Sequence, residues 1–175
     1  MDFVNIVSLG IIGFVTGSVY MSGSESKPSR QAKAIFTSGP AKILGSVEFV
    51  QLTDSMNVVI QVNLTGFEPN TSHGFHIHEK PVKPGDSCDL AGPHFDPTDS
   101  PHGGPHDGPR TRHVGDLGNI LADANGNVQV KFSDYLIDLI GPNSIIGRTL
   151  VIHEFADDLK TIQSSGKRIA CATIN

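Results

Sequence analysis

Hydrophobic and polar residues alternate along most of the chain from residue 32 onward. Val58, Ile60 and Val62 interleave with residues that face the other way, and this two-residue period recurs in other short segments. Successive side chains of a strand point to opposite faces of a sheet, so the period predicts β-strands with one buried face. The segments that we expect to form strands begin near residue 32 and continue with residues 43–51, 58–63, 72–79, 116–121, 127–132, 147–153 and 168–174.

Glycine, proline and asparagine separate these segments. Turn residues occur at 38–40, at Gly66 and at 68–70, and we expect Asn125-Gly126 to form a hairpin turn. About eight strands without a helical pattern predict an all-β fold, an eight-stranded Greek-key barrel or sandwich of the immunoglobulin-like kind. The length of 175 residues suits one such domain, which we assign to residues 31–175.

Residues 1–30 have a different character from the rest of the chain. Residues 3–21 carry no charge and are long enough for a marginal membrane span or a signal peptide. Asp2 and the lack of a clear Ala-x-Ala site argue against cleavage, whereas Lys27 and Arg30 of the polar linker would lie on the cytoplasmic side of an anchor. A membrane-anchored protein, an exported protein and a cytoplasmic protein with an extended tail all stay open.

Composition and charge narrow the function classes. The chain has 19 glycines, 11 prolines and only 18% charged residues, which is typical of a turn-rich β protein. The net charge is −5, and the sequence contains no basic stripe or aromatic platform. These features argue against a nucleic-acid partner.

Histidine is concentrated between residues 73 and 116, where seven of the eight histidines occur. Neutral imidazole is the commonest protein ligand for zinc and copper, so we interpret this region as a metal site. His76 and His78 flank Ile77 on a predicted strand and therefore share one face. The alternative for such a pair is the solvent-exposed face of a strand.

Two sets of candidate ligands follow from the pattern. His153, at the end of another apolar strand, adds to His76 and His78, and a site rich in nitrogen ligands suits copper. The second set combines imidazoles with one carboxylate, as tetrahedral zinc prefers, and consists of His94, His102, His113 and Asp116. Prolines and glycines between these residues predict a long loop, and the alternative is a disordered His/Pro tract.

Longer motifs make the chain resemble the copper/zinc superoxide dismutases. They occur in the family's order and are GFHIHE, C-x-x-AGPHF, HGGP, RHVGDLGNI, GRTLVIHEFADDL and G-x-R-x-AC. The resemblance covers roughly residues 33–174. It implies an enzyme that dismutes superoxide to oxygen and hydrogen peroxide by a copper redox cycle, with one copper and one zinc per subunit. The alternative is a non-catalytic copper/zinc-binding or copper-chaperone-like homologue.

The resemblance also implies roles for individual residues. The copper ligands would be His76, His78, His94 and His153. The zinc ligands would be His94, His102, His113 and Asp116. His94 would then bridge both metals and exchange a proton, Arg168 would guide the anion, and Asp157 would tie a copper-ligand histidine to a zinc-ligand histidine. The family's pattern has no role for His73 or His106, which we interpret as loop or strand-edge histidines, with His106 as an alternative zinc ligand.

Cys88 and Cys171 are the only two cysteines. The resemblance implies a disulfide between them that pins the histidine-rich loop to the last strand. Closing so long a loop would contribute about 4 kcal/mol in the chain-entropy model. Two reduced thiols are the alternative, since that is the default inside a reducing cell.

The chain departs from the family in two places. The segment between Leu159 and Arg168, KTIQSSGK, is shorter than the family's charged electrostatic loop, so we expect a wider active-site mouth. Lys160 and Lys167 would partly replace the lost positive potential, and superoxide dismutases are a well-known example of such steering. Lys80 stands where the family tends to have an aromatic residue. This position lies in a region that contributes to the family's dimer contact. We therefore expect a homodimer that is less stable than is usual in the family.

Overall fold

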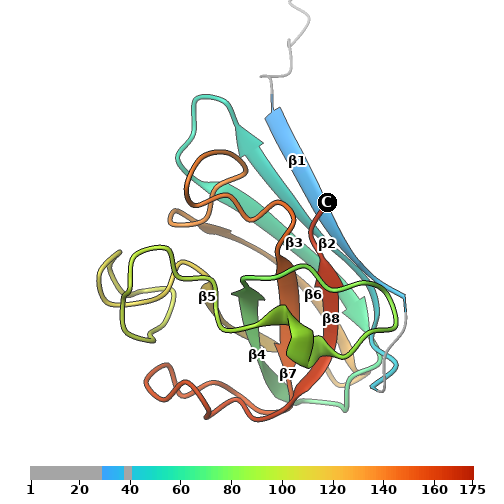
Figure 1. Ribbon diagram of the computed structural model, residues 1–175. Helices are drawn as coiled ribbons and strands as arrows, with labels where there is room; N and C mark the ends of the chain where they lie inside the picture. The colour runs from blue at the N-terminus through green and yellow to red at the C-terminus, as the bar shows by residue number, and fades with distance from the viewer. Residues whose placement is uncertain (1–28, 38–40) are drawn as a thin grey trace, which may run out of the picture.

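The computed structural model describes residues 29–37 and 41–175. These residues fold into two antiparallel β-sheets of four strands each, joined by loops (Figure 1). The first sheet contains, in spatial order, β1 (Ser29–Phe36), β2 (Leu44–Leu52), β3 (Val58–Thr65) and β6 (Asn127–Asp134). The second sheet contains β5 (Asp116–Leu121), β4 (Ser72–His78), β7 (Thr149–His153) and β8 (Arg168–Thr173). A short 3₁₀ helix, η1 (Cys88–Ala91), lies in the long connection between β4 and β5.

The observed topology confirms the predicted all-β class. The chain crosses from one sheet to the other after β3, β5 and β6, so strands that follow one another in sequence do not always pair. The hairpin prediction at Asn125-Gly126 is wrong for this reason. A turn forms there, with Gly126 at a φ of 73°, but it joins β5 to β6, which belong to different sheets.

The two sheets also meet along one edge, between β1 and the end of the chain. Ala34 forms a bridge to Ile174, and Lys33 exchanges backbone hydrogen bonds of 2.7 and 3.0 Å with Asn175. β1 begins at Ser29, so the sheet includes the last two residues of the predicted linker. The apolar stretch at residues 3–21 lies outside the described residues. Within the described ranges, no helix is both long and apolar enough to cross a membrane.

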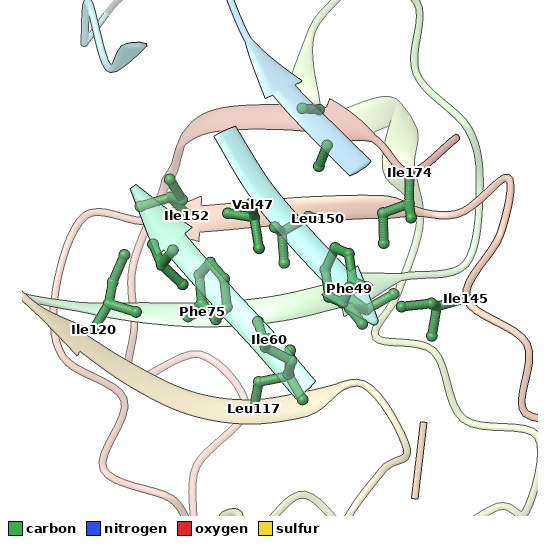
Figure 2. Close-up of a cluster of buried hydrophobic side chains, with 14 of the residues drawn as sticks. Val47, Phe49, Ile60, Phe75, Leu117, Ile120, Ile145, Leu150, Ile152 and Ile174 are labelled. Carbon is green, nitrogen blue, oxygen red and sulfur yellow. The ribbon is translucent and has the colours of Figure 1, made fainter. Parts of the chain in front are cut away.

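Alternate residues of both sheets fill the space between them (Figure 2). Phe49 of β2 and Ile60 of β3 lie in the same fully buried cluster as Phe75 of β4 and Leu150 of β7. Burying each such side chain contributes about 1.5–3 kcal/mol. This core fixes β4 and β7, the two strands that carry the first candidate ligands.

The long connection between β4 and β5 is ordered by backbone pairing and by a covalent bond. Phe95 N donates to Ile77 O at 2.8 Å, and Ile77 N donates to Gly115 O at 2.9 Å. A Cβ on Gly115 would lie 2.2 Å from Ile77 O, so only glycine permits this approach. A disulfide between Cys88 and Cys171 ties the same connection to β8. The connection between β4 and β5 is therefore an ordered loop and not a disordered His/Pro tract.

A buried ion pair holds the end of this loop. Arg112 is fully buried, and it donates through Nη1 to Asp116 O at 2.8 Å and through Nη2 to a carboxylate oxygen of Asp134. The other carboxylate oxygen of Asp134 accepts from the N–H groups of Leu136 and Ile137 at 2.8 and 3.1 Å. The pair therefore joins the first residue of β5 to the last residue of β6.

Replacing Asp134 by alanine should lower the free energy of unfolding by about 3–5 kcal/mol, because it leaves a buried guanidinium without its counter-charge. Urea denaturation of the metal-free, disulfide-bonded protein measures this loss. The control is Glu48→Ala, which breaks an exposed 2.8 Å pair with Lys33 and should cost less than about 1 kcal/mol. A small and equal loss in both variants would contradict the assigned role of Arg112.

Candidate metal centre

Seven side chains from β4, the β4–β5 loop, β5 and β7 converge on one region beside the sandwich core. They form two groups in which one potential ligand atom of each residue lies within 4.8 Å of the others. The four-histidine cluster consists of His76, His78, His94 and His153. The carboxylate cluster consists of His94, His102, His113 and Asp116. The fold thus brings together all seven residues of the two predicted ligand sets, and His94 belongs to both clusters.

In the four-histidine cluster, hydrogen bonds to carbonyl groups fix which ring nitrogen carries the proton. His78 Nδ1 lies 2.8 Å from Gly92 O, and His153 Nδ1 lies 3.3 Å from Gly166 O. A carbonyl only accepts, so both Nδ1 atoms carry hydrogen and both Nε2 atoms expose a lone pair. These two Nε2 atoms face each other at 3.4 Å. Two lone pairs at this distance repel unless a cation lies between them.

His76 presents the same condition with its other nitrogen. Its Nε2 lies 2.8 Å from Asp157 Oδ2 and therefore carries the proton. Its Nδ1 is buried and has no hydrogen-bond partner among the described residues. A buried polar atom without a partner costs about 1–3 kcal/mol. The unpartnered nitrogen and the facing lone pairs fit a bound cation with nitrogen ligands.

The carboxylate cluster gathers three Nδ1 atoms around the carboxylate of Asp116. Asp116 Oδ1 lies 2.7 Å from His94 Nδ1 and 3.1 Å from His113 Nδ1. Asp116 Oδ2 lies 3.0 Å from His102 Nδ1, which is not aligned for a hydrogen bond. Three imidazole nitrogens and one carboxylate are a donor set that suits tetrahedral zinc.

Burial and charge set opposite proton preferences in the two clusters. Burial, assisted by the neighbouring histidines, lowers the pKa of His78 to about 2 and that of His153 to about 3. These rings are therefore neutral, which is the form that binds metal. Burial also disfavours a charge on His102, but the two neighbouring carboxylates, Asp116 at 3.0 Å from Nδ1 and Asp157 at 3.0 Å from Nε2, raise its pKa to about 10. The carboxylate cluster thus retains a positive charge even without a metal.

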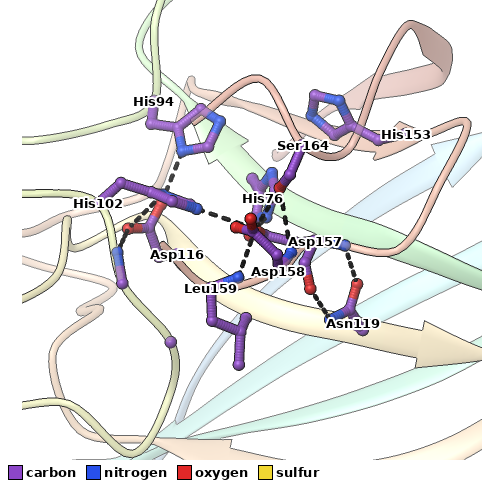
Figure 3. A network of polar contacts seen from close by, with 12 residues as sticks. His76, His94, His102, Asp116, Asn119, His153, Asp157, Asp158, Leu159 and Ser164 are labelled. Atoms are coloured by element: carbon purple, nitrogen blue, oxygen red, sulfur yellow. Dashed lines mark hydrogen bonds and ion pairs between the residues drawn. The ribbon is translucent and has the colours of Figure 1, made fainter. Parts of the chain in front are cut away.

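Asp157 connects the two clusters (Figure 3). Its carboxylate lies 2.8 Å from His76 Nε2 and 3.0 Å from His102 Nε2, so it orients one histidine of each cluster. Burial would raise the pKa of Asp157, but hydrogen bonds from these two rings hold it below its ordinary value. Asn119 fixes the backbone of Asp157 through two hydrogen bonds of 2.7 and 2.9 Å. Sequence reasoning missed Asn119, although its place on β5 three residues after Asp116 offered a weak signal.

His73 has a structural role that the sequence pattern did not indicate. It is buried in β4, an interior strand, so its interpretation as a loop or strand-edge histidine is wrong. Its Nδ1 lies 2.7 Å from His153 O, and its Nε2 lies 2.8 Å from Thr71 Oγ1. It thereby fixes the backbone of His153. His106 is exposed and belongs to neither cluster.

A cavity of about 640 Å³ opens onto the four-histidine cluster, and Arg168 lies at its wall. The Arg168 guanidinium donates through Nη1 to Cys88 O at 3.1 Å and through Nη2 to Gly92 O at 2.7 Å. The disulfide fixes the loop that supplies these carbonyl groups. Arg168 is therefore held as a fixed positive charge beside a solvent-accessible opening, and such a charge attracts anions. Lys167 and Ile162 also line this cavity.

Comparisons with known proteins agree with this geometry. The sequence matches the family described as copper/zinc superoxide dismutase (SODC) over residues 43–174. A Cu-Zn superoxide dismutase of Paramecium bursaria Chlorella virus 1 is 46% identical over 145 residues, which cover 78% of this chain and 73% of the viral protein. That of Humicola lutea is 43% identical over 147 residues, covering 78% of this chain and 92% of the fungal protein.

Structural similarity points the same way. A solved structure described as the clock protein EA4 superposes with a TM-score of 0.74 at 38% sequence identity, covering 83% of this chain and 93% of the other. The family match spans most of the chain and includes both clusters. The chain therefore belongs to the copper/zinc superoxide dismutase family.

Proposed function

We propose that this protein dismutes superoxide to oxygen and hydrogen peroxide, with copper held by the four-histidine cluster and zinc held by the carboxylate cluster. The observation that carries this proposal is the sharing of His94. Its Nδ1 lies 2.7 Å from Asp116 Oδ1, while the same ring belongs to the four-histidine cluster. One imidazole can therefore present a nitrogen to each of two cations.

The two clusters differ in ligand type and in solvent access, and these differences match the preferences of copper and zinc. The four-histidine cluster offers only nitrogen ligands and opens to the cavity, so a small anion can reach it. The carboxylate cluster includes the fully buried Asp116, whose negative charge stabilises a divalent cation in a closed site. When bound, copper supplies one-electron chemistry and zinc supplies a fixed positive charge.

Residues of the chain itself bind the anion and donate a proton to it. Arg168 holds the anion beside the four-histidine cluster, because its guanidinium is locked by backbone carbonyl groups. Burial lowers the pKa of His94 to about 4. A proton on His94 Nε2 is therefore given up readily to a more basic anion in the cavity. Asp157 keeps His76 and His102 in the tautomers that present Nδ1 to the clusters.

A non-catalytic metal-binding or copper-chaperone-like role is the second reading of the family. It is not favoured, because all the ligand candidates and Arg168 are present and assembled. Copper chaperones of this family usually bring an additional thiol-rich domain. This chain has only two cysteines, and both are used in one disulfide.

A homodimer is part of the proposal. Residues 82–88, β1 and β8 line an open groove of about 660 Å³, close to the regions that form the family's dimer contact. Ile35 of β1 is 57% exposed on this side, and it would be covered by a second copy. Sedimentation equilibrium should give twice the 18.6 kDa mass of one chain, and a single-chain mass at micromolar concentration would remove the dimer from the proposal.

For the amino-terminal region we retain two proposals, a membrane anchor and an exported protein, with residues 31–175 as the catalytic domain. The support is the uncharged stretch at residues 3–21. A cytoplasmic protein with an unprocessed tail is the alternative. Mass spectrometry of the mature amino terminus, together with fractionation of membranes, distinguishes these cases.

Replacing His153 by alanine should lower superoxide turnover by at least about 10-fold. Removing a residue that only orients a metal ligand already costs about 10–100-fold in activity, and removing the ligand itself should cost no less. Copper content should fall while zinc stays near one per chain, because His153 belongs only to the four-histidine cluster. The measurements are metal analysis and pulse-radiolysis turnover. The matched control is His106→Ala, which removes an exposed histidine outside both clusters. Equal turnover in the two variants would reject the copper assignment.

Turnover at low substrate concentration should decline as salt is added, because Lys167 and Arg168 attract the anion to the cavity. Lys167→Gln should reduce kcat/KM roughly two- to fivefold at low ionic strength, and the difference from wild type should vanish at high salt. Lys131→Gln is the matched control, since Lys131 lies on β6 away from the cavity. A wild-type rate that is independent of salt would reject steering, and so would equal effects of the two substitutions.

A further inference from the structure

The short loop between Asp157 and Arg168 is closed tightly at its base. Glu154 N donates to Lys167 O at 2.8 Å, and Phe155 N donates to Ser165 O at 2.9 Å. Ser165 is buried against β4, where a Cβ on Gly74 would come within 2.8 Å of its side chain. The base of the loop is therefore fixed to the strand that carries two ligand candidates.

Ser164 links the two halves of this loop through its hydroxyl group (Figure 3). Ser164 Oγ donates to Asp157 Oδ1 at 3.0 Å and accepts from Asp158 N at 3.0 Å. Its own N–H donates to Thr161 O at 2.9 Å. The hydroxyl thus makes one donor and one acceptor contact, which is what fixes a serine rotamer.

The contact of Ser164 falls on the carboxylate oxygen that orients the carboxylate cluster. Asp157 Oδ1 accepts from His102 Nε2 at 3.0 Å, from Leu159 N at 2.8 Å and from Ser164 Oγ at 3.0 Å. Two of these three donors come from the short loop. The side chain of Leu159 also packs on Gly104, two residues after His102. The contacts that close the loop therefore also hold the carboxylate that orients the His102 ring.

We propose that Ser164 is a positioning residue, which holds the Asp157 carboxylate in the plane that orients His102 and thereby sets the zinc affinity of the carboxylate cluster. This inference rests on the proposed function in that zinc occupies this cluster. Without the hydroxyl, the carboxylate loses a donor that restrains its rotation, and Asp158 N loses its acceptor. Leu159 N alone then restrains Oδ1 from the loop side. The His102 ring is consequently less well oriented toward Asp116.

The expected change in zinc affinity depends on how many contacts separate Ser164 from the zinc-binding histidine. Partners that touch a metal-binding histidine typically change metal affinity by about 10–100-fold when they are removed. Ser164 acts one contact further away, through Asp157. We therefore expect Ser164→Ala to raise the zinc dissociation constant by roughly three- to tenfold.

The test measures zinc affinity in the copper-free, disulfide-bonded protein by competition with a chromogenic chelator. The visible absorption of Co²⁺ bound in place of zinc reports the ligand geometry independently of enzyme activity. Ser164→Ala should weaken zinc binding and alter the Co²⁺ spectrum. Ser164→Thr retains the hydroxyl and should restore both. Gln163→Ala, at an exposed neighbouring position, should leave both unchanged.

Three results overturn the inference. The first is an unchanged zinc affinity and Co²⁺ spectrum in Ser164→Ala, even if its thermal unfolding midpoint falls, since that pattern means a structural role only. The second is an equal loss in Ser164→Thr, and the third is an equal loss in Gln163→Ala. A failure of the proposed function is recognised separately, because wild type and His113→Ala would then bind zinc equally.

Discussion

The arrangement of this protein depends on buried imidazole nitrogens that find no hydrogen-bond donor within the described part of the chain. Carbonyl and carboxylate partners fix the protons of His76, His78 and His153 on the outer nitrogens. The inner nitrogens of His78 and His153 therefore face each other as lone pairs, and that of His76 has no hydrogen-bond partner among the described residues. Each unsatisfied group costs about 1–3 kcal/mol. A single cation relieves all of them together, so metal binding contributes directly to the stability of the fold. The hydrophobic core, the loop pairing and the disulfide hold the rings in place against that cost.

Two buried carboxylates balance the charge of this arrangement. Burial would raise the pKa of Asp116, but the side chains of His102, His113 and His94 hold it below the ordinary value. Asp116 Oδ2 also accepts from the N–H groups of Gly103 and His113, both at 3.0 Å. His102 lies between Asp116 and Asp157 and has a pKa raised to about 10. The two carboxylates therefore favour a positively charged group between them. A proton on His102 Nδ1 and a metal ion would compete for this nitrogen, because metal binds the deprotonated ring.

The sequence was sufficient to predict the strands and the histidines that converge on one region, because each rests on a local pattern. Alternating burial marks β3 and β2, and His-x-His on β4 places two rings on one side of a strand. The partners that orient those rings could not be predicted this way. Asn119 and Ser164 reach Asp157 only because β5 and the short loop meet in space, and His73 holds His153 across two paired strands. The sheet exchange at Asn125-Gly126 was missed for the same reason, since a turn sequence specifies a bend and not a pairing partner.

The short loop after Asp157 contacts the carboxylate of Asp157 on its inner side and borders the solvent-accessible cavity on its outer side. On the inner side it supplies two hydrogen bonds to Asp157 Oδ1, the carboxylate oxygen that also accepts from His102 Nε2. On the outer side it leaves Ile162 and Lys167 at the rim of a wide cavity. Halving the length of a loop reduces its closure cost by only about 0.6 kcal/mol, so the order of the inner side comes mainly from its hydrogen bonds. In this chain the loop therefore acts on the site mainly through its inner side, where Leu159 N and Ser164 Oγ restrain the carboxylate of Asp157.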